Sequence, residues 1–91
     1  MRVVWTGRAS QDLARVRDFL IPINPSAALK VVRALRAATL KLAENPRVGA
    51  PVERYSPREI RRLIVGGYEI RYEVTGNAIL IVRLWHTRED R

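Results

Sequence analysis

The stretch that decides the fold is IRRLIVGGYEIRYEV, residues 60–74. It contains two runs rich in branched and aromatic residues, separated by the dipeptide Gly66-Gly67. This pattern is typical of a β-hairpin with a two-residue turn. Such a turn fixes the pairing of the two strands, and the side chains that share one face follow from it. The pairs predicted on the face that the helices cover are Val65 with Tyr68, Leu63 with Ile70, and Arg61 with Tyr72.

The opposite face of this hairpin is predicted to carry Arg62, Ile64, Glu69, Arg71 and Glu73. A second tight turn at 75–77 precedes residues 78–85, AILIVRLW, which predict another strand. This strand is apolar on both sides, which indicates a central position in the sheet. The turn has two or three residues, and both registers stay open. Alternation along the strand groups Leu80, Val82 and Leu84 on one face and Ile79, Ile81 and Trp85 on the other.

The N-terminal half predicts a short strand and two helices. Residues 2–5, RVVW, indicate the strand, and residues 9–20 carry apolar side chains at helical spacing. Asn24 is a typical helix cap, and Pro25 fits the first turn of a second helix whose apolar stripe continues to Leu42. Because about three residues join the two helices, we expect an antiparallel helical hairpin.

Residues 45–59 carry three prolines and one glycine and predict a long loop. In so small a domain, a loop of this length is usually functional or held by a partner. The predicted order of elements is β-α-α-β-β-β, in a single domain that spans residues 1–91. This is an α+β fold in which a helical hairpin packs on one face of a small, mostly antiparallel sheet. The other face is left open and is lined with charge.

The composition predicts a polyanionic partner. The chain has 17 basic and 9 acidic residues and a formal net charge of +8. Fifteen of the basic residues are arginine, which binds phosphate and carboxylate groups in a bidentate geometry. The absence of cysteine excludes disulfides and thiolate metal sites. Because the sequence shows no signal peptide and no membrane-spanning run, we expect a cytoplasmic protein.

Five segments stand in a characteristic order along the chain. They are A-x-x-D-L (Ala9, Asp12, Leu13), N-P-x-x-A (24–28), L-x-x-x-P-x-x-G (Leu42, Pro46, Gly49), the hairpin 60–74, and ILIVRLWHTR (79–88). In this order and spacing they resemble the RelE/ParE superfamily of bacterial toxins. The resemblance covers the chain from Trp5 to Arg88.

The resemblance implies the toxin of a type II toxin–antitoxin system. ParE-like members poison DNA gyrase by trapping its cleaved complex, whereas RelE-like members are ribosome-dependent endoribonucleases that cut mRNA. Members of both kinds are neutralised by a cognate antitoxin. The implied partners are therefore an antitoxin and either DNA gyrase or the ribosome with its mRNA, and DNA is reached only through the antitoxin. The resemblance implies no metal and no other cofactor.

A metal-independent endoribonuclease needs a base, an acid and positive charge on the phosphate. His86 is the candidate acid or base, because imidazole titrates near neutral pH. Arg62, Arg71 and Arg88 are the candidates that hold the phosphate, and the predicted pairing places Arg62 and Arg71 on the same face. In the simpler interpretation, His86 is a hydrogen-bonded residue at a strand end and Arg71 forms cross-strand ion pairs.

Two features argue against the nuclease. Glu69 follows Tyr68 at the position where several RelE-like enzymes have a basic catalytic residue. Those enzymes also often have a tyrosine near the C-terminus, whereas residues 87–91 contain no aromatic side chain. We therefore favour the gyrase poison, which is not itself an enzyme, and keep the mRNA endoribonuclease as the alternative. A further alternative is a non-toxic basic module that binds nucleic acid or protein.

The candidates for contact with the target or the antitoxin are Arg54, Arg58, Arg61 and Trp85. The three arginines belong to the basic segment 54–62, although such a run is also typical of a solvated surface. Tyr68 and Tyr72 are predicted to face inward, which argues against an RNA-binding sheet with exposed stacking rings.

Overall fold

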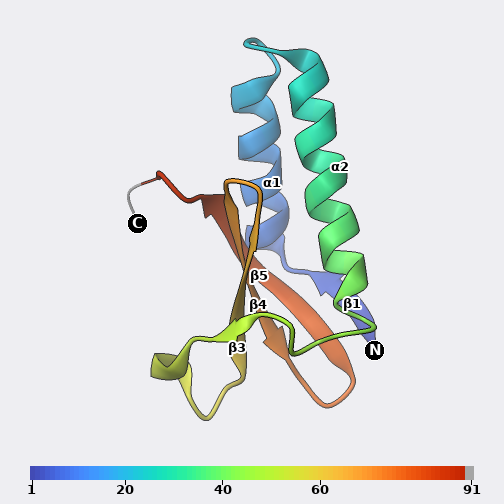
Figure 1. The fold of residues 1–91 in the computed structure, drawn as a ribbon, viewed down its shortest axis with the longest axis vertical. Helices are drawn as coiled ribbons and strands as arrows, with labels where there is room; N and C mark the ends of the chain where they lie inside the picture. Colours follow the sequence, from blue (N-terminus) through green and yellow to red (C-terminus); the bar gives the residue numbers. More distant parts are fainter. Residues whose placement is uncertain (90–91) are drawn as a thin grey trace.

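The computed structural model describes residues 1–89 and shows a helical hairpin packed on one face of a five-stranded mixed sheet (Figure 1). The elements are β1 (Arg2–Trp5), α1 (Gly7–Leu20), α2 (Pro25–Lys41), β2 (Ala50–Pro51), the 3-10 turn η1 (Glu53–Tyr55), β3 (Ile60–Val65), β4 (Tyr68–Val74) and β5 (Ala78–His86). The strand order is β1-β5-β4-β3-β2, with β1 parallel to β5 and the other neighbours antiparallel. The predicted α+β fold is confirmed, with β2 as an additional strand.

Each helix begins at a side chain that caps its first turn. The Thr6 hydroxyl accepts a hydrogen bond from the Ala9 amide (3.1 Å), and the Asn24 side chain accepts one from the Ala27 amide (3.1 Å). Such caps satisfy backbone donors that have no partner within the helix. The prediction of Asn24 as a cap is confirmed. α1 begins at Gly7, two residues before the predicted start, because Thr6 provides its cap.

The hairpin of β3 and β4 has the predicted register, with Val65 opposite Tyr68 across the diglycine turn. Gly66 has a φ of 59°, in the left-handed region that L side chains rarely adopt. The turn before β5 has a two-residue tip, because the Thr75 amide donates a hydrogen bond to the Ala78 carbonyl (2.9 Å). This bond resolves the choice between two and three residues that the sequence leaves open.

A β-bulge interrupts the pairing of β4 with β5. Tyr72 lies opposite Ile81, whereas the preceding residue, Arg71, lies opposite Arg83. Val82 is therefore an extra residue on β5, without a counterpart on β4. Because side chains alternate between the two faces of a strand, one extra residue reverses the facing of every side chain that follows it.

The bulge corrects the predicted faces of β5. Leu84 lies opposite Ile70 on the face that the helices cover, and Trp85 lies opposite Glu69 on the other face. The predicted grouping of Leu84 with Leu80 is therefore wrong, and so is the grouping of Trp85 with Ile79 and Ile81. Strict alternation holds only up to the bulge.

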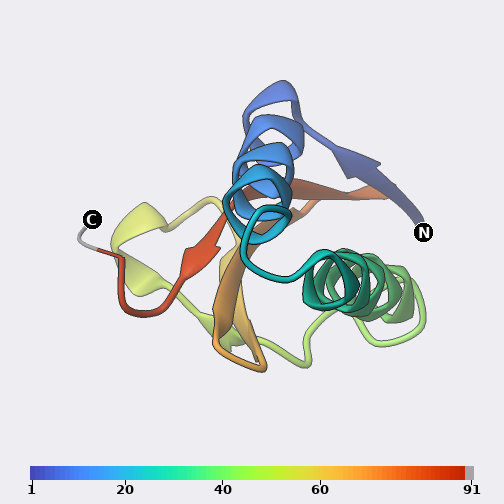
Figure 2. The same ribbon diagram turned by 90° about the horizontal axis from the view of Figure 1, so that it is seen from above.

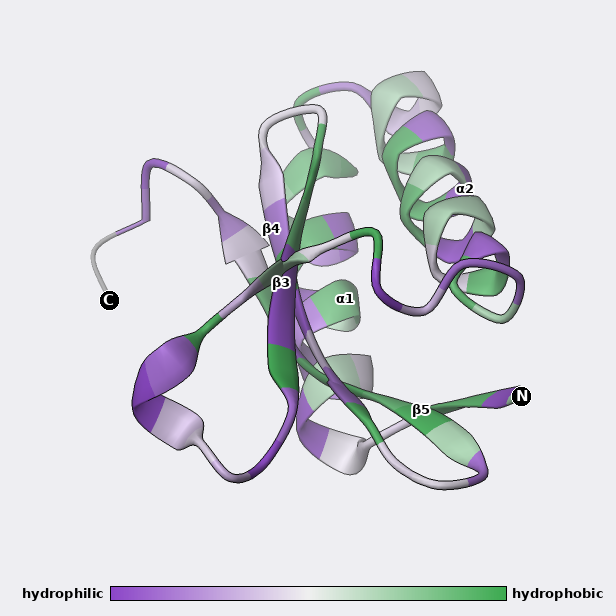
Figure 3. Cartoon of the chain, turned by 60° about the horizontal axis from the view of Figure 1, so that its bottom comes forward, coloured by the Kyte–Doolittle hydropathy of each residue, from purple (hydrophilic) through white to green (hydrophobic). Residues whose placement is uncertain are grey.

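The hydrophobic core lies between the helical hairpin and the sheet, and the apolar residues of β5 run through it (Figure 3). The position of β5 matches the prediction of a central strand, because β5 has β1 on one side and β4 on the other. The large buried side chains that form the core are Leu13, Val16, Leu35, Leu42, Ile70, Tyr72, Ile79, Ile81 and Leu84.

The segment 45–59, predicted as a loop, contains β2 and η1 and is tied to the sheet at several points. Its first part is held by Tyr72, whose hydroxyl accepts a hydrogen bond from the Gly49 amide (2.9 Å) and donates one to the Pro46 carbonyl (2.9 Å). Its second part, with η1, lies on the side of the sheet away from α2 (Figure 2). The predicted charged face is therefore partly covered.

Candidate functional site

A basic hollow with a volume of about 760 Å³ lies on the sheet face that carries Arg71, beside the first turn of α1. Two aromatic side chains, Tyr55 and Trp85, line it together with the apolar side chains Ile60 and Val82. Trp85 reaches the hollow because the bulge in β5 turns it to this face. The arginines that line the basic hollow are Arg8, Arg54, Arg58, Arg71 and Arg83.

Arg71 lies at the centre of this face and is held on two sides. Its Nε donates a hydrogen bond to Glu69 Oε2 (2.8 Å), two residues earlier on the same strand. Its guanidinium carbon lies 5.1 Å from the centroid of the Trp85 ring, a cation–π distance. The carboxylate and the ring together fix the plane of the guanidinium group.

Arg58 connects the segment after η1 to the sheet. It donates two hydrogen bonds to the carboxylate of Glu73, from Nε (3.2 Å) and from a terminal nitrogen (2.9 Å). These hydrogen bonds outweigh the burial of the Glu73 carboxyl and lower its pKa below the ordinary value. The bidentate pair holds the rim of the hollow against β4.

Arg83 is positioned by Asp12, a buried carboxylate on α1 with 5 % exposure. Asp12 accepts hydrogen bonds from Arg83 Nε (2.8 Å), the Leu84 amide (3.0 Å) and an Arg15 terminal nitrogen (2.9 Å). Burial by itself raises the pKa of the Asp12 carboxyl, but these bonds outweigh it, so the pKa lies below its ordinary value. The aspartate of the A-x-x-D-L segment therefore fastens α1 to β5 and orients an arginine of the basic hollow.

Arg54 and Tyr55 form the outer wall of the hollow. A terminal nitrogen of Arg54 donates a hydrogen bond to the Tyr55 hydroxyl (3.2 Å), and its guanidinium carbon lies 5.0 Å from the ring centroid. The hydrogen bond and the positive charge of Arg54 lower the pKa of Tyr55, with a smaller contribution from Arg71. Within residues 1–89, neither Arg54 nor Arg8 has a carboxylate partner.

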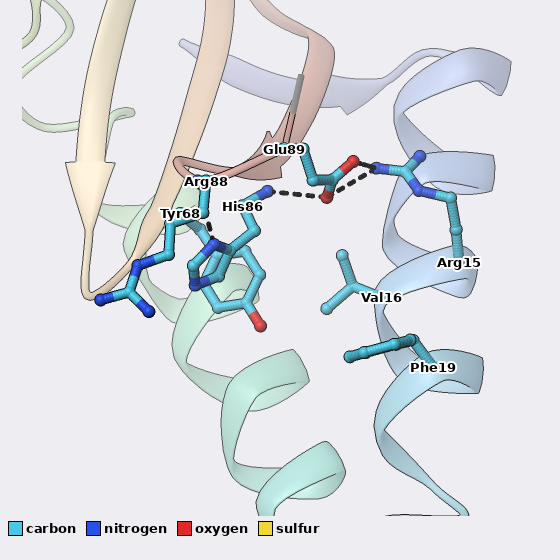
Figure 4. Close-up of a pocket in the computed structure, with 7 residues that line it drawn as sticks. All are labelled: Arg15, Val16, Phe19, Tyr68, His86, Arg88 and Glu89. Atoms are coloured by element: carbon cyan, nitrogen blue, oxygen red, sulfur yellow. Dashed lines mark hydrogen bonds and ion pairs between the residues drawn. The ribbon is translucent and has the colours of Figure 1, made fainter. Parts of the chain in front are cut away.

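A second pocket, the C-terminal pocket, lies between α1 and the end of β5 and has a volume of about 420 Å³ (Figure 4). The His86 ring packs edge-on against Tyr68, with the two ring centroids 5.0 Å apart. Its Nδ1 accepts a hydrogen bond from the Arg88 amide (3.1 Å). Nδ1 is therefore unprotonated, and the proton of the neutral ring lies on Nε2.

Glu89 closes one side of the C-terminal pocket. Its carboxylate accepts a hydrogen bond from the His86 amide (2.9 Å) and forms an ion pair with Arg15 of α1 (3.1 Å) (Figure 4). Burial, together with the negative charge of Glu89, raises the pKa of the Tyr68 hydroxyl. Val16 and Phe19 of α1 form the opposite, apolar side (Figure 4).

The structure does not bring together the four residues predicted for RNA cleavage. His86 lies opposite Tyr68 on the helix-covered face, and Arg88 lines the C-terminal pocket with it. Arg62 and Arg71 lie opposite each other on the other face, as predicted. The sheet therefore separates His86 from the two strand arginines. The bulge is the cause, since an unbroken β5 would turn His86 to the same face as Arg71.

Three of the four predicted contact residues, Arg54, Arg58 and Trp85, line the basic hollow. Arg61 lies on the other face, where it donates hydrogen bonds to Glu59 Oε2 (2.8 Å) and to the Gly49 carbonyl (2.7 Å). Its internal bonds match a structural role, and its role as a contact stays a prediction.

Besides the apolar Ile60 and Val82, sequence reasoning missed three residues of the hollow: Arg8, Tyr55 and Arg83. Arg8 and Tyr55 come from α1 and η1, which meet only in the folded chain. Arg83 was hidden by the assumption of regular alternation. An arginine inside an otherwise apolar strand was the one available signal for it.

The family model for the ParE toxin of the type II toxin–antitoxin system parDE matches residues 3–91. The chain belongs to the ParE toxin family. Among curated relatives, Toxin RelE2 of Caulobacter vibrioides is 38 % identical over 86 residues, with 93 % of each chain covered. Toxin RelE1 of the same organism is 34 % identical over 90 residues, covering 98 % of this chain and 96 % of the relative.

A solved structure gives the same result for the fold. A chain of the chromosomal ParDE toxin–antitoxin system from P. aeruginosa matches with a TM-score of 0.79 and 27 % identity, covering 94 % of this chain and 95 % of that chain. The predicted membership of the RelE/ParE superfamily is thus confirmed, and the protein is a toxin of the type II toxin–antitoxin class.

The part of the toxin that the structure describes contains no cluster of three or more histidine or acidic side chains that could hold a metal ion. Its two helices are also too short or too polar to cross a membrane.

Proposed function

We propose that this toxin inhibits DNA gyrase by trapping the cleaved complex. The observation that supports this proposal is the separation of His86 from Arg62 and Arg71 by the sheet. Metal-independent RNA cleavage needs its acid, its base and its positive charge around one phosphate. The proposed site of action is the cytoplasm, where gyrase acts on the chromosome.

A cognate antitoxin is the proposed partner, and we propose that it covers the helical hairpin. Large apolar side chains lie exposed there, including Phe19 (69 %), Ile23 (67 %) and Leu40 (67 %). An exposed apolar surface of this kind is typical of a protein interface. Phe19→Ala should weaken binding of the antitoxin by on the order of tenfold or more, whereas Val48→Ala, an exposed apolar control off the hairpin, should not.

The test of the gyrase proposal uses purified gyrase, relaxed plasmid and ATP, with the toxin added alone or after mixing with its antitoxin. We expect inhibition of supercoiling and the appearance of linear plasmid after detergent and protease treatment. Premixing with the antitoxin should prevent both effects. A folded toxin that arrests growth but leaves gyrase unaffected would contradict the proposal.

The second candidate function is cleavage of mRNA on the ribosome, and one observation favours it. Arg54 and Arg71 lie near Tyr55 in the basic hollow, and they lower the pKa of its hydroxyl. A phenol with a lowered pKa is a better general base, and arginines stabilise the charge on phosphate. In this case Tyr55, and not His86, would be the acid–base residue. Mapping of 5′ ends on mRNA from translating ribosomes distinguishes this function from gyrase inhibition.

A further inference from the structure

The basic hollow has more positive charge than its own carboxylates neutralise. Five guanidinium groups line it, and three carboxylates, those of Asp12, Glu69 and Glu73, each hold one of them. Within the described residues, Arg8 and Arg54 are left without a carboxylate partner. Their two charges are therefore available to an anionic ligand.

The three paired arginines are already oriented. Arg58, Arg71 and Arg83 each bind their carboxylate through Nε. Fixing a guanidinium group at Nε holds its plane before a ligand arrives, so less side-chain entropy is lost on binding. The hollow thus combines fixed arginines on the sheet with two uncompensated arginines from α1 and η1.

The ligand that fits this arrangement is a chain of phosphates. The arginine fork matches phosphate in a bidentate geometry, and the net charge of +8 attracts an extended polyanion rather than a single anion. The Tyr55 and Trp85 rings each have an arginine over one face, and they provide apolar surface for the sugars of a nucleic acid backbone.

We infer that the basic hollow binds the phosphodiester backbone of DNA directly. This inference rests on the proposed function, because the cleaved complex of gyrase presents DNA to the toxin. It departs from the expectation that DNA is reached only through the antitoxin. Contact with the backbone does not depend on the base sequence, because phosphate contacts position a protein without reading the bases.

The test measures binding of the toxin alone to a fluorescent DNA duplex of mixed sequence, by anisotropy at several salt concentrations and without gyrase. The variant Arg8→Ala/Arg54→Ala removes the two unpaired arginines. The matched control Lys30→Ala/Arg33→Ala removes two exposed positive charges on α2, away from the hollow. A single-stranded RNA of equal length and poly-glutamate are the competing ligands.

We expect the Arg8/Arg54 variant to bind DNA on the order of tenfold more weakly. The slope of the logarithm of the binding constant against the logarithm of the salt concentration should become shallower by about one for each arginine removed. The α2 control should bind like the wild type. Equal weakening in the control would overturn the inference, because binding would then depend on net charge alone. Tighter binding of RNA, or displacement of DNA by an equal charge of poly-glutamate, would also overturn it.

The two proposals fail in different ways. If the toxin inhibits gyrase but does not bind DNA through the hollow, only the inference about the hollow is contradicted. DNA binding by a toxin that leaves gyrase unaffected contradicts only the gyrase target.

Discussion

The hydroxyl of Tyr72 lies 2.9 Å from the Gly49 amide nitrogen, and this contact joins two sequence segments of the family across the fold. The same hydroxyl bonds to the Pro46 carbonyl, so the proline and the glycine of L-x-x-x-P-x-x-G are held by one side chain of β4. Tyr72 itself is fully buried. The spacing of this segment thus reflects a turn built around a phenol rather than a binding motif.

Tyr72→Phe should destabilise the toxin by about 1–3 kcal/mol, because it leaves the buried Gly49 amide and the Pro46 carbonyl without their partner. Urea unfolding measures the difference. The control Tyr55→Phe changes an exposed residue and should alter the free energy of unfolding by less than about 0.5 kcal/mol. Equal effects of the two changes would show that the Tyr72 hydroxyl is not a fastening point.

Gly49→Ala should cost about 3 kcal/mol, because a Cβ at this position would lie 2.6 Å from both the Arg62 carbonyl oxygen and the Tyr72 hydroxyl. Gly7→Ala is the matched control, since its Cβ would meet nothing within 4 Å. Thermal unfolding of the two variants should differ by many degrees. A Gly49→Ala variant as stable as Gly7→Ala would contradict the close approach of β4 to this turn.

Asp12→Asn should destabilise the toxin by about 1–3 kcal/mol at pH 7, because it removes the charge that Arg83 and Arg15 share. The direction in which this stability difference changes with pH follows from the lowered pKa of the Asp12 carboxyl. The stabilisation is complete above the pKa of the unfolded chain, about 3.9, and is lost as the pH falls through the lower pKa of the folded state. Denaturation from pH 7 to pH 2 should therefore show the variant and the wild type converging in acid. A constant difference would mean that the carboxylate charge is not involved.

His86→Ala should reduce gyrase inhibition by less than about tenfold, since His86 lies on the sheet face away from the basic hollow. The supercoiling assay measures this effect, and circular dichroism verifies the fold. If the toxin instead cuts mRNA through the hollow, Tyr55→Phe should lower the cleavage rate by about 10²–10⁴ while His86→Ala does not. A loss of that size in His86→Ala, with the fold intact, would restore the histidine as a catalytic residue.

The elements that the sequence predicted correctly are those with local causes. Gly66-Gly67 fixes the hairpin register, and the Asn24 cap fixes the start of α2. β2 was missed because two residues carry no periodic pattern, and its place depends on the Tyr72 hydroxyl some twenty residues away in the chain. The bulge at Val82 was missed for a similar reason, since Asp12 of α1 bonds to residues immediately after it.

That single missed residue decided the site. With regular alternation, His86 belongs with Arg71 and the nuclease set is complete on one face. With the bulge, His86 lies on the helix-covered face, and Arg83 and Trp85 lie on the same face as Arg71. Sequence reasoning therefore found several correct residues of the hollow but grouped them with His86, which lies on the other face of the sheet.

β5, an interior strand of this sheet, is also the last strand to be synthesised. β5 lies between β1 and β4 and supplies Ile79, Ile81 and Leu84 to the core. Until residues 78–86 have left the ribosome, β1 has no neighbour to pair with and the helical hairpin has no complete surface to pack on. We therefore expect a product that ends before residue 78 to lack the folded core and to be inactive as a toxin. The order of the strands thus makes the fold depend on the last strand of the described chain.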